Sequence, residues 1–450
     1  MRDLISEAAR RSARYLESLQ ERSMAPRSEA VERLKGFNVP LQEEPIPAVE
    51  VLAELDDIGS AATAASAGPR YFGFVTGGSL PAALAANYLA GAWDQNAVFQ
   101  VASPATAYLE EVCRRWLAAL FGLPPEAGIG FVTGATMANF SALAAARHAL
   151  LDRRGWDVEA QGLFGAPQIK VIVGEEVHVS VLKALSLLGL GRERVVRVAV
   201  DGQGRMRPGA IQPLAEPAII CIQSGNVNTG AFDPAQEICE IAKASDSWVH
   251  VDGAFGLWAA ACPERAHLAA GVACAHSWAT DAHKWLNVPY DSGIVFVRDP
   301  QQLQASMSTR APYLVAGDAR EPSQYTPELS RRARGVEIWA ALRSLGRRGL
   351  ADLIGRNCRQ ARRFADGLRT AGYAVLNEVV LNQVLASFGS PEQTRQVVRR
   401  VQADGTCWCG GTEWQSHTAM RISVSSWATT GEDVERSLAA IIRLASESEP

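Results

Sequence analysis

Three residues that could share one chemical task stand at separate points of the chain. Lys284 lies in SWATDAHKW, before a turn and the apolar run GIVFVRD, Asp252 ends the run WVHV, and His178 follows the run IKVIVG. Taken singly, each has an ordinary explanation, because lysine is mostly exposed, aspartate often caps a loop, and a histidine is more often hydrogen-bonded in a core than catalytic. Taken together, an amine, a carboxylate and a flat imidazole indicate a site for one common ligand.

A fourth segment adds a place for a phosphate. After the run GIGFV, Gly134, Ala135 and Thr136 begin an expected helix, TGATMANFSAL. Small and hydroxyl residues at a helix start leave backbone N–H groups and the positive end of the helix dipole for an anion. The alternative is a plain glycine turn with a threonine cap.

Pyridoxal phosphate explains the four features jointly. Lys284 would form a Schiff base with its aldehyde, which requires an amine whose pKa is lowered by burial or by neighbouring charge. Asp252 would keep the pyridine nitrogen protonated, so that the ring can accept electrons from the substrate. Ala254 is small enough to let the ring lie close to the strand end, and His178 could stack on the opposite face and reach the substrate carboxylate or a transferred proton.

An α/β fold would bring these residues together. Between about residues 79 and 335 the chain alternates helical patterns with short apolar runs, which indicate strands buried on both faces of a mostly parallel sheet. The runs are GIGFVTG, IKVIVG, RVVRVAV, AIICIQSG, WVHVDGA and GIVFVRD. Ligands bind beyond the carboxyl ends of such strands. We therefore expect an N-terminal arm at residues 1–78, a large cofactor-binding domain at residues 79–335 and a small α+β domain at residues 336–450.

Composition argues against several other functions. The 450 residues are 48% hydrophobic, which is enough to fill more than one core, and the net charge of -4 without a basic block argues against nucleic acid as a partner. The eight cysteines include no CxxC pair, and Cys407-Trp-Cys409 is too tight for a zinc site, so we expect no metal and reduced thiols in a cytoplasm. The first segment is a poor signal peptide, and no stretch of about 18 apolar residues predicts a membrane span.

The lysine segment resembles the signature of the group II pyridoxal-phosphate-dependent amino-acid decarboxylases, which include the aromatic-L-amino-acid, histidine and glutamate enzymes. Ser277 and Trp278 precede Lys284 and Trp285 at the matching spacing. Other segments between about residues 70 and 350 are similar to the same family. They are PRYFGFVTGGSLPAALAANYLAGAWDQNAVFQ, FVTGATMANFSAL, VHVSVLKAL, HVDGAFG and LSRRARGVEIWAALRSLG.

The resemblance implies a fold type I enzyme with a seven-stranded central sheet, assembled as a homodimer with active sites at the subunit interface. It implies that Lys284 is the Schiff-base lysine, that Asp252 pairs with the pyridinium, and that Ala254 and His178 lie on opposite faces of the ring. The remaining cofactor contacts that it implies are Gly134, Ala135, Thr136, His283 and Asn226. Asn226 stands in CIQSGNVNTGAFDP, a motif that departs from the family pattern.

Two departures concern the reaction and the substrate. The interval APYLVAGDAREPSQYTPELS is shorter than the family's mobile loop, and its Tyr313 and Tyr325 are the candidates for the tyrosine that donates a proton. We place Tyr325 and Arg421 at the substrate. Arg421, in TAMRISVSSW, resembles the arginine with which aminotransferases of this fold bind the substrate carboxylate, although a lone arginine on a strand is as often a surface or phosphate-facing residue.

The expected reaction is decarboxylation of an L-amino acid to an amine and carbon dioxide. The alternatives are an aminotransferase or an aldolase on the same fold, because the bond perpendicular to the conjugated ring is the one that breaks. An arginine that held the carboxylate in the ring plane would disfavour loss of carbon dioxide. A binding protein without activity is a third hypothesis, but none of the expected site residues is missing. The sequence does not identify the amino acid.

Overall fold

The computed structural model describes residues 1–309 and 320–447 and divides into two compact units. One unit comprises Met1–Gly78, Gln360–Leu376 and Val384–Pro450, and the other comprises Ser79–Arg359 and Asn377–Gln383. Helix α11 (Gly335–Thr370) runs through both units and changes direction at Gly346, whose positive φ interrupts the helical backbone. Tyr313 lies outside the described residues.

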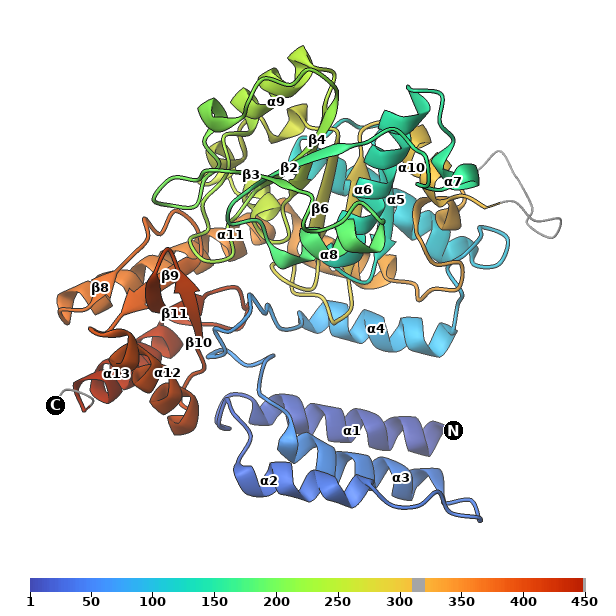
Figure 1. Ribbon diagram of the computed structural model, residues 1–450. Helices are drawn as coiled ribbons and strands as arrows, with labels where there is room; N and C mark the ends of the chain where they lie inside the picture. Colours follow the sequence, from blue (N-terminus) through green and yellow to red (C-terminus); the bar gives the residue numbers. More distant parts are fainter. Residues whose placement is uncertain (310–319, 448–450) are drawn as a thin grey trace. The chain divides into compact units, whose positions relative to one another are not determined.

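The Ser79–Arg359 unit is built on a seven-stranded sheet, which confirms the predicted α/β architecture (Figure 1). The strand order is β1-β7-β6-β5-β4-β2-β3, and β7 alone runs antiparallel to its two neighbours. The strands are β1 (Gly128–Val132), β2 (Lys170–Gly174), β3 (Val196–Val198), β4 (Ala218–Gln223), β5 (Trp248–Asp252), β6 (Ser277–Asp281) and β7 (Gly293–Val297).

One central strand, β6, was absent from the predicted apolar runs. Its sequence SWATD contains a serine, a threonine and an aspartate, yet all five residues are buried. Their polar groups are accommodated because Ser277 accepts a hydrogen bond from Nε1 of Trp248, and Asp281 lies at the strand end, where it accepts from a backbone N–H group. Because such polar residues interrupt an apolar run, a buried strand that contains them is not identified from the hydrophobicity pattern.

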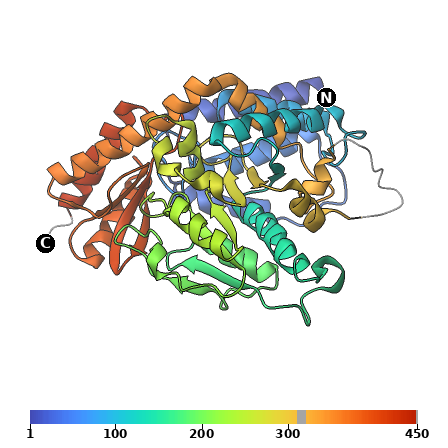
Figure 2. The ribbon, with the colours of Figure 1, turned by 90° about the horizontal axis from the view of Figure 1, so that it is seen from above.

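Helix α6 (Ala135–Asp152) packs across β1, β5, β6 and β7 and shares a core with the neighbouring helices α8 and α10. Its alanines at 138, 142, 145 and 149 recur at helical spacing and are all buried, so the small side chains let the helix approach the sheet closely. In Figure 2 this helix, in teal, runs alongside the strands. The other helices of this unit are α4 (Pro81–Trp93), α5 (Pro104–Phe121), α7 (Val158–Gln161), α8 (Val179–Leu187), α9 (Ala235–Ala244) and α10 (Pro300–Met307).

The other unit combines the N-terminal helices with a small α+β fold. A four-stranded sheet has the order β10-β11-β9-β8, and a buried ion pair of 3.0 Å between Arg70 and Asp433 joins the N-terminal segment to the last helix. The elements are α1 (Arg2–Ser18), α2 (Ser28–Arg33), α3 (Ala48–Glu54), β8 (Ala374–Val375), β9 (Gln383–Ser387), α12 (Pro391–Asp404), β10 (Gly410–Trp414), β11 (His417–Ser423) and α13 (Gly431–Ser446). No helix in residues 1–309 or 320–447 is long and apolar enough to cross a membrane.

Candidate active site

Residues from several loops meet in one pocket at the carboxyl ends of β2, β4, β5 and β6. His178, Asp252, Ala254 and Lys284 all line it, although the first and last are more than 100 residues apart. The remaining lining residues are Gln223, Gly225, Val227 and Phe255, none of which was singled out from the sequence. Three of these follow β4 or end it, so the order of the strands brings them beside β5.

Lys284 lies in the turn after β6, and its side chain is only 18% exposed. Its Nζ atom is 3.0 Å from Oδ2 of Asp281, and Oδ1 of the same carboxylate accepts a 2.6 Å hydrogen bond from the backbone N–H of Ala135. The lysine is therefore a paired amine in a pocket rather than a surface residue. Asp281, which the sequence analysis did not single out, links this amine to the start of α6.

The helix start at which a phosphate is expected is that of α6. Gly134 precedes the helix, and a side chain on the facing Gly293 would overlap the Gly134 backbone, so position 293 requires glycine. The N–H of Ala135 is taken by Asp281, and the N–H groups of Thr136 and Met137 in the first turn have no acceptor within the helix, which begins its ladder with Ala138 donating to Gly134. Thr136 is thus better placed than Ala135 to donate to an anion.

His283 flanks this helix start. Its Nδ1 accepts a 3.0 Å hydrogen bond from the backbone N–H of Ser292, so the neutral ring carries its proton on Nε2, 3.5 Å from Asp281. Burial lowers the pKa of His283, against the attraction of Asp281. The Ser292 hydroxyl beside it is buried without a hydrogen-bond partner in the described chain, which leaves another donor at this end of the sheet.

Asp252 is buried and surrounded by donors. Oδ1 accepts from the backbone N–H of Ala254 at 3.2 Å, and Oδ2 accepts from Nδ2 of Asn139 at 3.2 Å and from the hydroxyl of Ser180 at 3.4 Å. These contacts hold the carboxylate at the end of β5. Asn139 and Ser180 come from α6 and α8, and no sequence pattern connects them with the aspartate.

His178 caps helix α8 at the edge of the pocket. Its Nδ1 accepts from the backbone N–H of Ser180 at 3.3 Å and lies 2.8 Å from the hydroxyl of the same serine. Because Nδ1 is an acceptor, the neutral ring carries its proton on Nε2. The loop that supplies this histidine therefore orients the ring before any ligand binds.

Asn226 does not line the pocket, in contrast to the prediction for a residue beside the ring. Its Nδ2 donates to Glu176 at 2.9 Å, and its Oδ1 accepts from the backbone N–H groups of Asn228 and Thr229. The amide therefore shapes the loop after β4. Gly225, with a positive φ and with Gly256 packed against it, is the residue of this loop that faces the pocket.

Tyr325 is placed in the core and not in the pocket. It packs against Gly128 and Gly130, early in β1, whereas the pocket lies beyond the carboxyl ends of the strands. Its hydroxyl accepts a 2.7 Å hydrogen bond from Gln304, and burial raises its pKa. The structure therefore does not bring Tyr325 into the pocket, and its substrate role stays a prediction.

Arg421 belongs to the other compact unit, where it lies on β11 opposite Gly410 of β10. Partial burial lowers the pKa of its guanidinium. Its predicted role at the substrate stays a prediction.

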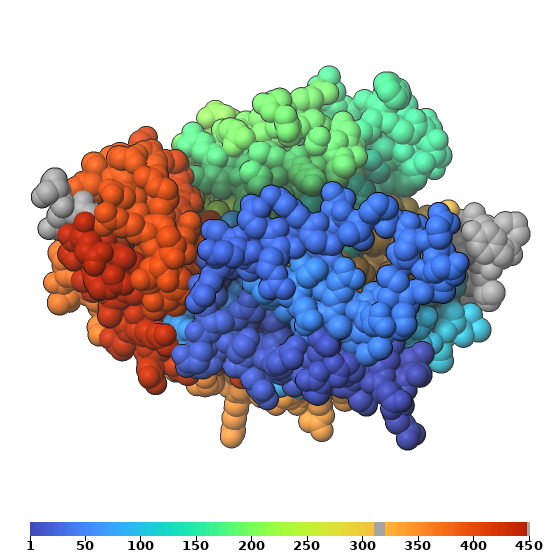
Figure 3. Space-filling model, turned by 90° about the horizontal axis from the view of Figure 1, so that it is seen from below, coloured from blue at the N-terminus to red at the C-terminus, as the bar shows by residue number. Residues whose placement is uncertain are grey.

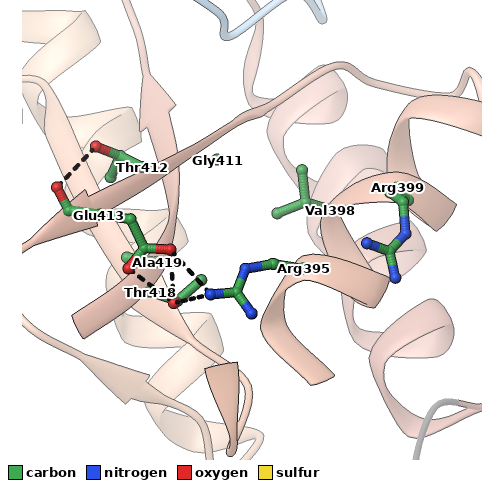
Figure 4. Close-up of a pocket in the computed structure, with 8 residues that line it drawn as sticks. All are labelled: Arg395, Val398, Arg399, Gly411, Thr412, Glu413, Thr418 and Ala419. Carbon is green, nitrogen blue, oxygen red and sulfur yellow. Dashed lines mark hydrogen bonds and ion pairs between the residues drawn. The ribbon is translucent and has the colours of Figure 1, made fainter. Parts of the chain in front are cut away.

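A second hollow, of about 410 Å³, lies between α12 and strands β10 and β11 (Figure 4). Its Arg395 contacts Glu413 and Thr418, and its Arg399 is paired with Glu392 outside the hollow. Among the described residues, its lining includes no lysine amine that could form a Schiff base and no imidazole. The chemistry predicted from the sequence is therefore located in the first pocket.

The groups of the first pocket, together with the start of α6 that Asp281 links to Lys284, fit pyridoxal phosphate. An amine can bind the aldehyde, a buried carboxylate can bind the ring nitrogen, an oriented imidazole can cover the ring, and a helix start with His283 and Ser292 can bind the phosphate.

Comparisons with known proteins agree with this fit. The family described as the pyridoxal-dependent decarboxylase conserved domain matches residues 31–387. The chain is 28% identical to a phenylacetaldehyde synthase of Petunia hybrida, over 75% of this chain and 69% of the relative. It is 25% identical to an aromatic-L-amino-acid decarboxylase of Bacillus atrophaeus, over 84% of this chain and 82% of the relative. The crystal structure of Oryza sativa TDC with PLP and tryptamine superimposes with a TM-score of 0.92 at 23% identity, covering 99% of this chain and 97% of that one.

Proposed function

The chain belongs to the pyridoxal-dependent decarboxylase family, and we propose that it uses Lys284, Asp252 and His178 to remove the carboxyl group of an L-amino acid. It is a pyridoxal-phosphate-dependent carboxy-lyase, so the products are an amine and carbon dioxide. The observation that supports these residue roles is the shared pocket of the three side chains with Ala254 at the strand ends.

Two residues would hold the cofactor by its reactive groups. When bound, pyridoxal phosphate supplies an aldehyde that links to amines and a ring that accepts electrons. Lys284 would bind the aldehyde carbon covalently. When a substrate amine displaces Lys284 from that carbon, Asp281 would pair with the released lysine ammonium, because its carboxylate lies 3.0 Å from Nζ. Asp252 would keep a proton on the ring nitrogen, since it is buried and its position is set by three donors.

His178 is the residue proposed to handle a proton at the substrate. The acceptor role of Nδ1 puts the ring proton on Nε2, and the residue lines the pocket. Such a group could orient the substrate carboxylate or deliver a proton to the α-carbon after carbon dioxide leaves. Val227 and Phe255 supply apolar surface near it.

The identity of the amino acid is a further question within this proposal. Relatives are named for aromatic, acidic and diamino substrates, among them L-tyrosine/L-DOPA decarboxylase 2 of Lophophora williamsii and L-2,4-diaminobutyrate decarboxylase of Rhizobium meliloti. The alignments span between 56% and 82% of the lengths of the curated relatives. We therefore propose an L-amino acid as the substrate, without naming which one. Arg421 is the residue that we propose to bind its carboxylate.

A product screen tests the proposed reaction. Purified protein loaded with pyridoxal phosphate is incubated with aromatic, acidic and diamino L-amino acids, and carbon dioxide, amine, oxo acid and aldehyde are measured. Release of carbon dioxide with an equal amount of amine is expected for at least one class. An oxo acid formed only when a second oxo acid is consumed would indicate transamination, and an aldehyde from a β-hydroxy amino acid would indicate aldol cleavage. Either result without carbon dioxide would contradict the proposal.

A homodimer is proposed from the surface of the N-terminal helices. Helix α1 has no buried residue, and large apolar side chains within residues 1–60 are exposed. They include Ile5, Val39, Leu41, Val49 and Leu55, of which Leu41 is 91% exposed. Figure 3 shows the surface of these helices in blue. Exposed apolar area of this extent marks an interaction surface, and a second copy of the chain is the proposed occupant.

A cytoplasmic location is proposed from the cysteines. All eight lie in the described residues as free thiols, and six of them are buried. Thiols that are kept reduced are typical of a reducing compartment.

A further inference from the structure

A line of buried hydrogen bonds runs from the interior of the sheet to Asp252. Nε1 of Trp248 donates to the hydroxyl of Ser277 at 2.9 Å, and that hydroxyl lies 2.9 Å from Nδ1 of His250. Nε2 of His250 lies 2.9 Å from Oδ1 of Asn139, and Nδ2 of Asn139 donates to Oδ2 of Asp252 at 3.2 Å. All five residues are at most 4% exposed.

The carboxylate of Asp252 sets the direction of the hydrogen bonds in this line, because it can only accept. Since Asp252 accepts from the NH2 group of Asn139, the amide oxygen Oδ1 faces Nε2 of His250 and can only accept from it. Nε2 of His250 therefore carries the ring proton and Nδ1 is an acceptor. The Ser277 hydroxyl, which accepts from the indole of Trp248, then donates its own proton to Nδ1.

The opposite tautomer of His250 would require the side-chain amide of Asn139 to exchange the positions of its oxygen and its NH2 group. With a proton on Nδ1, the bare Nε2 of His250 would face a donor, and Asn139 would have to turn its NH2 group toward it. The amide oxygen would then face the carboxylate of Asp252, and the two oxygens would repel each other in a buried place. Burial lowers the pKa of His250 to about 4 despite the nearby Asp252, so the ring is neutral near pH 7.

We propose that Asn139 and His250 are positioning residues that orient Asp252 toward the ring nitrogen of the cofactor. This inference rests on the proposed function, since it concerns the carboxylate that would bind the cofactor. In this tautomer, Nε2–H of His250 donates to the oxygen of the Asn139 amide, which keeps the NH2 group of that amide directed toward the carboxylate of Asp252. Asp252 is thereby presented in one orientation, and neither positioning residue needs to contact the cofactor.

The tautomer can be read directly in the unaltered holoenzyme. In protein labelled with 15N at histidine, the His250 signals should show an unprotonated Nδ1 and a protonated Nε2 between pH 6 and 8. The His250→Gln variant identifies these signals by their loss. A proton on Nδ1, or on both nitrogens, would overturn the proposed direction of the line, whether or not the cofactor role of Asp252 holds.

Cofactor affinity tests the consequence for Asp252. In His250→Gln the amide nitrogen can still donate to Asn139, so the dissociation constant for pyridoxal phosphate should stay within about threefold of the unaltered protein. His250→Phe keeps the volume and removes the donor, and Asn139→Asp replaces the NH2 group with an oxygen. Loss of the hydrogen bond to the charged Asp252 predicts affinity weaker by about tenfold or more in Asn139→Asp. His250→Phe loses the group that orients the Asn139 amide, so its affinity should fall in the same direction.

The matched control is His276→Phe. His276 is a half-buried histidine next to Trp248, but its Nδ1 accepts from the backbone N–H of Val249, and none of the hydrogen bonds that the structure describes joins its ring to the line. This variant should lose stability in urea and keep its cofactor affinity. Equal affinity in His250→Phe and His276→Phe would overturn the inference. Failure of the unaltered protein to bind pyridoxal phosphate would instead contradict the proposed function, while the nitrogen signals would still report the tautomer.

Discussion

At the scale of single residues, the environment of Lys284 explains how an amine can be held ready in a pocket. Asp281 lies between the lysine and the start of α6, and it contacts both with its two oxygens. The carboxylate also approaches His283. A lysine paired in this way has a defined position, which a free surface lysine lacks.

The first prediction concerns Lys284 itself. Lys284→Ala should abolish the yellow colour of the protein loaded with pyridoxal phosphate and the adduct that borohydride traps, because no other described amine lines the pocket. Absorbance and mass spectrometry of the reduced protein measure the adduct. Lys170→Ala, which changes an exposed lysine at the start of β2, is the control and should retain the adduct. A trapped adduct of full intensity in Lys284→Ala would refute the assignment.

At the scale of elements, two histidines on or beside neighbouring strands have lowered pKa values, one on a fully buried ring and one on a half-buried ring. Burial lowers the pKa of His250 on β5 and of His276 before β6 to about 4 each. Asp233 shows the opposite behaviour, since burial raises its pKa to about 6. Burial disfavours the charged form of both kinds of group, and they give opposite dependences of stability on pH.

The second prediction is the pH dependence caused by His276. Its folded pKa lies below the unfolded value of 6.5, so the unfolded chain takes up a proton first and the free energy of unfolding falls as the pH drops from about 6.5 to 4. We expect the unaltered protein to lose roughly 2 kcal/mol more than His276→Phe over this range, allowing for the partial exposure of the ring.

Urea titrations at several pH values measure this difference. Comparing the two proteins cancels the contribution of Asp233, which has the opposite sign: it favours folding below about pH 4 and loses that effect as the pH rises through about 6. Parallel curves for the two proteins would show that His276 does not titrate between the folded and unfolded states as expected.

At the scale of the whole molecule, the N-terminal segment has an exposed helix, α1, followed by residues that are buried in a core. Residues 2–18 form α1, which has no buried side chain, whereas Leu19 and Met24 are buried with Ala65 and Tyr71. Arg11 also joins α1 to Asp56 by a 2.8 Å ion pair. The chain after residue 18 is thus part of a core, and the helix before it is available for a partner.

The third prediction follows from this division. Deletion of residues 1–18 should leave the remaining fold intact and weaken self-association by at least tenfold, because it removes exposed apolar area and leaves Leu19 and Met24 in place. Sedimentation measures the association, and circular dichroism checks the fold. Deletion of residues 1–25 is the comparison and should also lower stability. A truncated chain that is folded and fully dimeric would leave α1 without the proposed role.

The sequence by itself determined the secondary elements around the site and the residue types in it. Apolar runs identified β1, β2, β3, β4, β5 and β7, because burial on both faces leaves a local pattern that needs no knowledge of the partners. The positions of Lys284, Asp252 and His178 after such runs placed them at strand ends. The family resemblance added the cofactor, and the match over residues 31–387 confirms it.

Only the tertiary structure decided which groups meet. Strand order and side-chain partners depend on contacts between distant segments, and a local pattern carries no information about them. The buried polar strand β6, the carboxylate of Asp281 at the helix start, and the amide of Asn139 on Asp252 each looked ordinary in the sequence. For the same reason Tyr325, which stood near the expected loop, lies against early residues of β1 instead, since the glycines of that strand leave room for its ring and backbone.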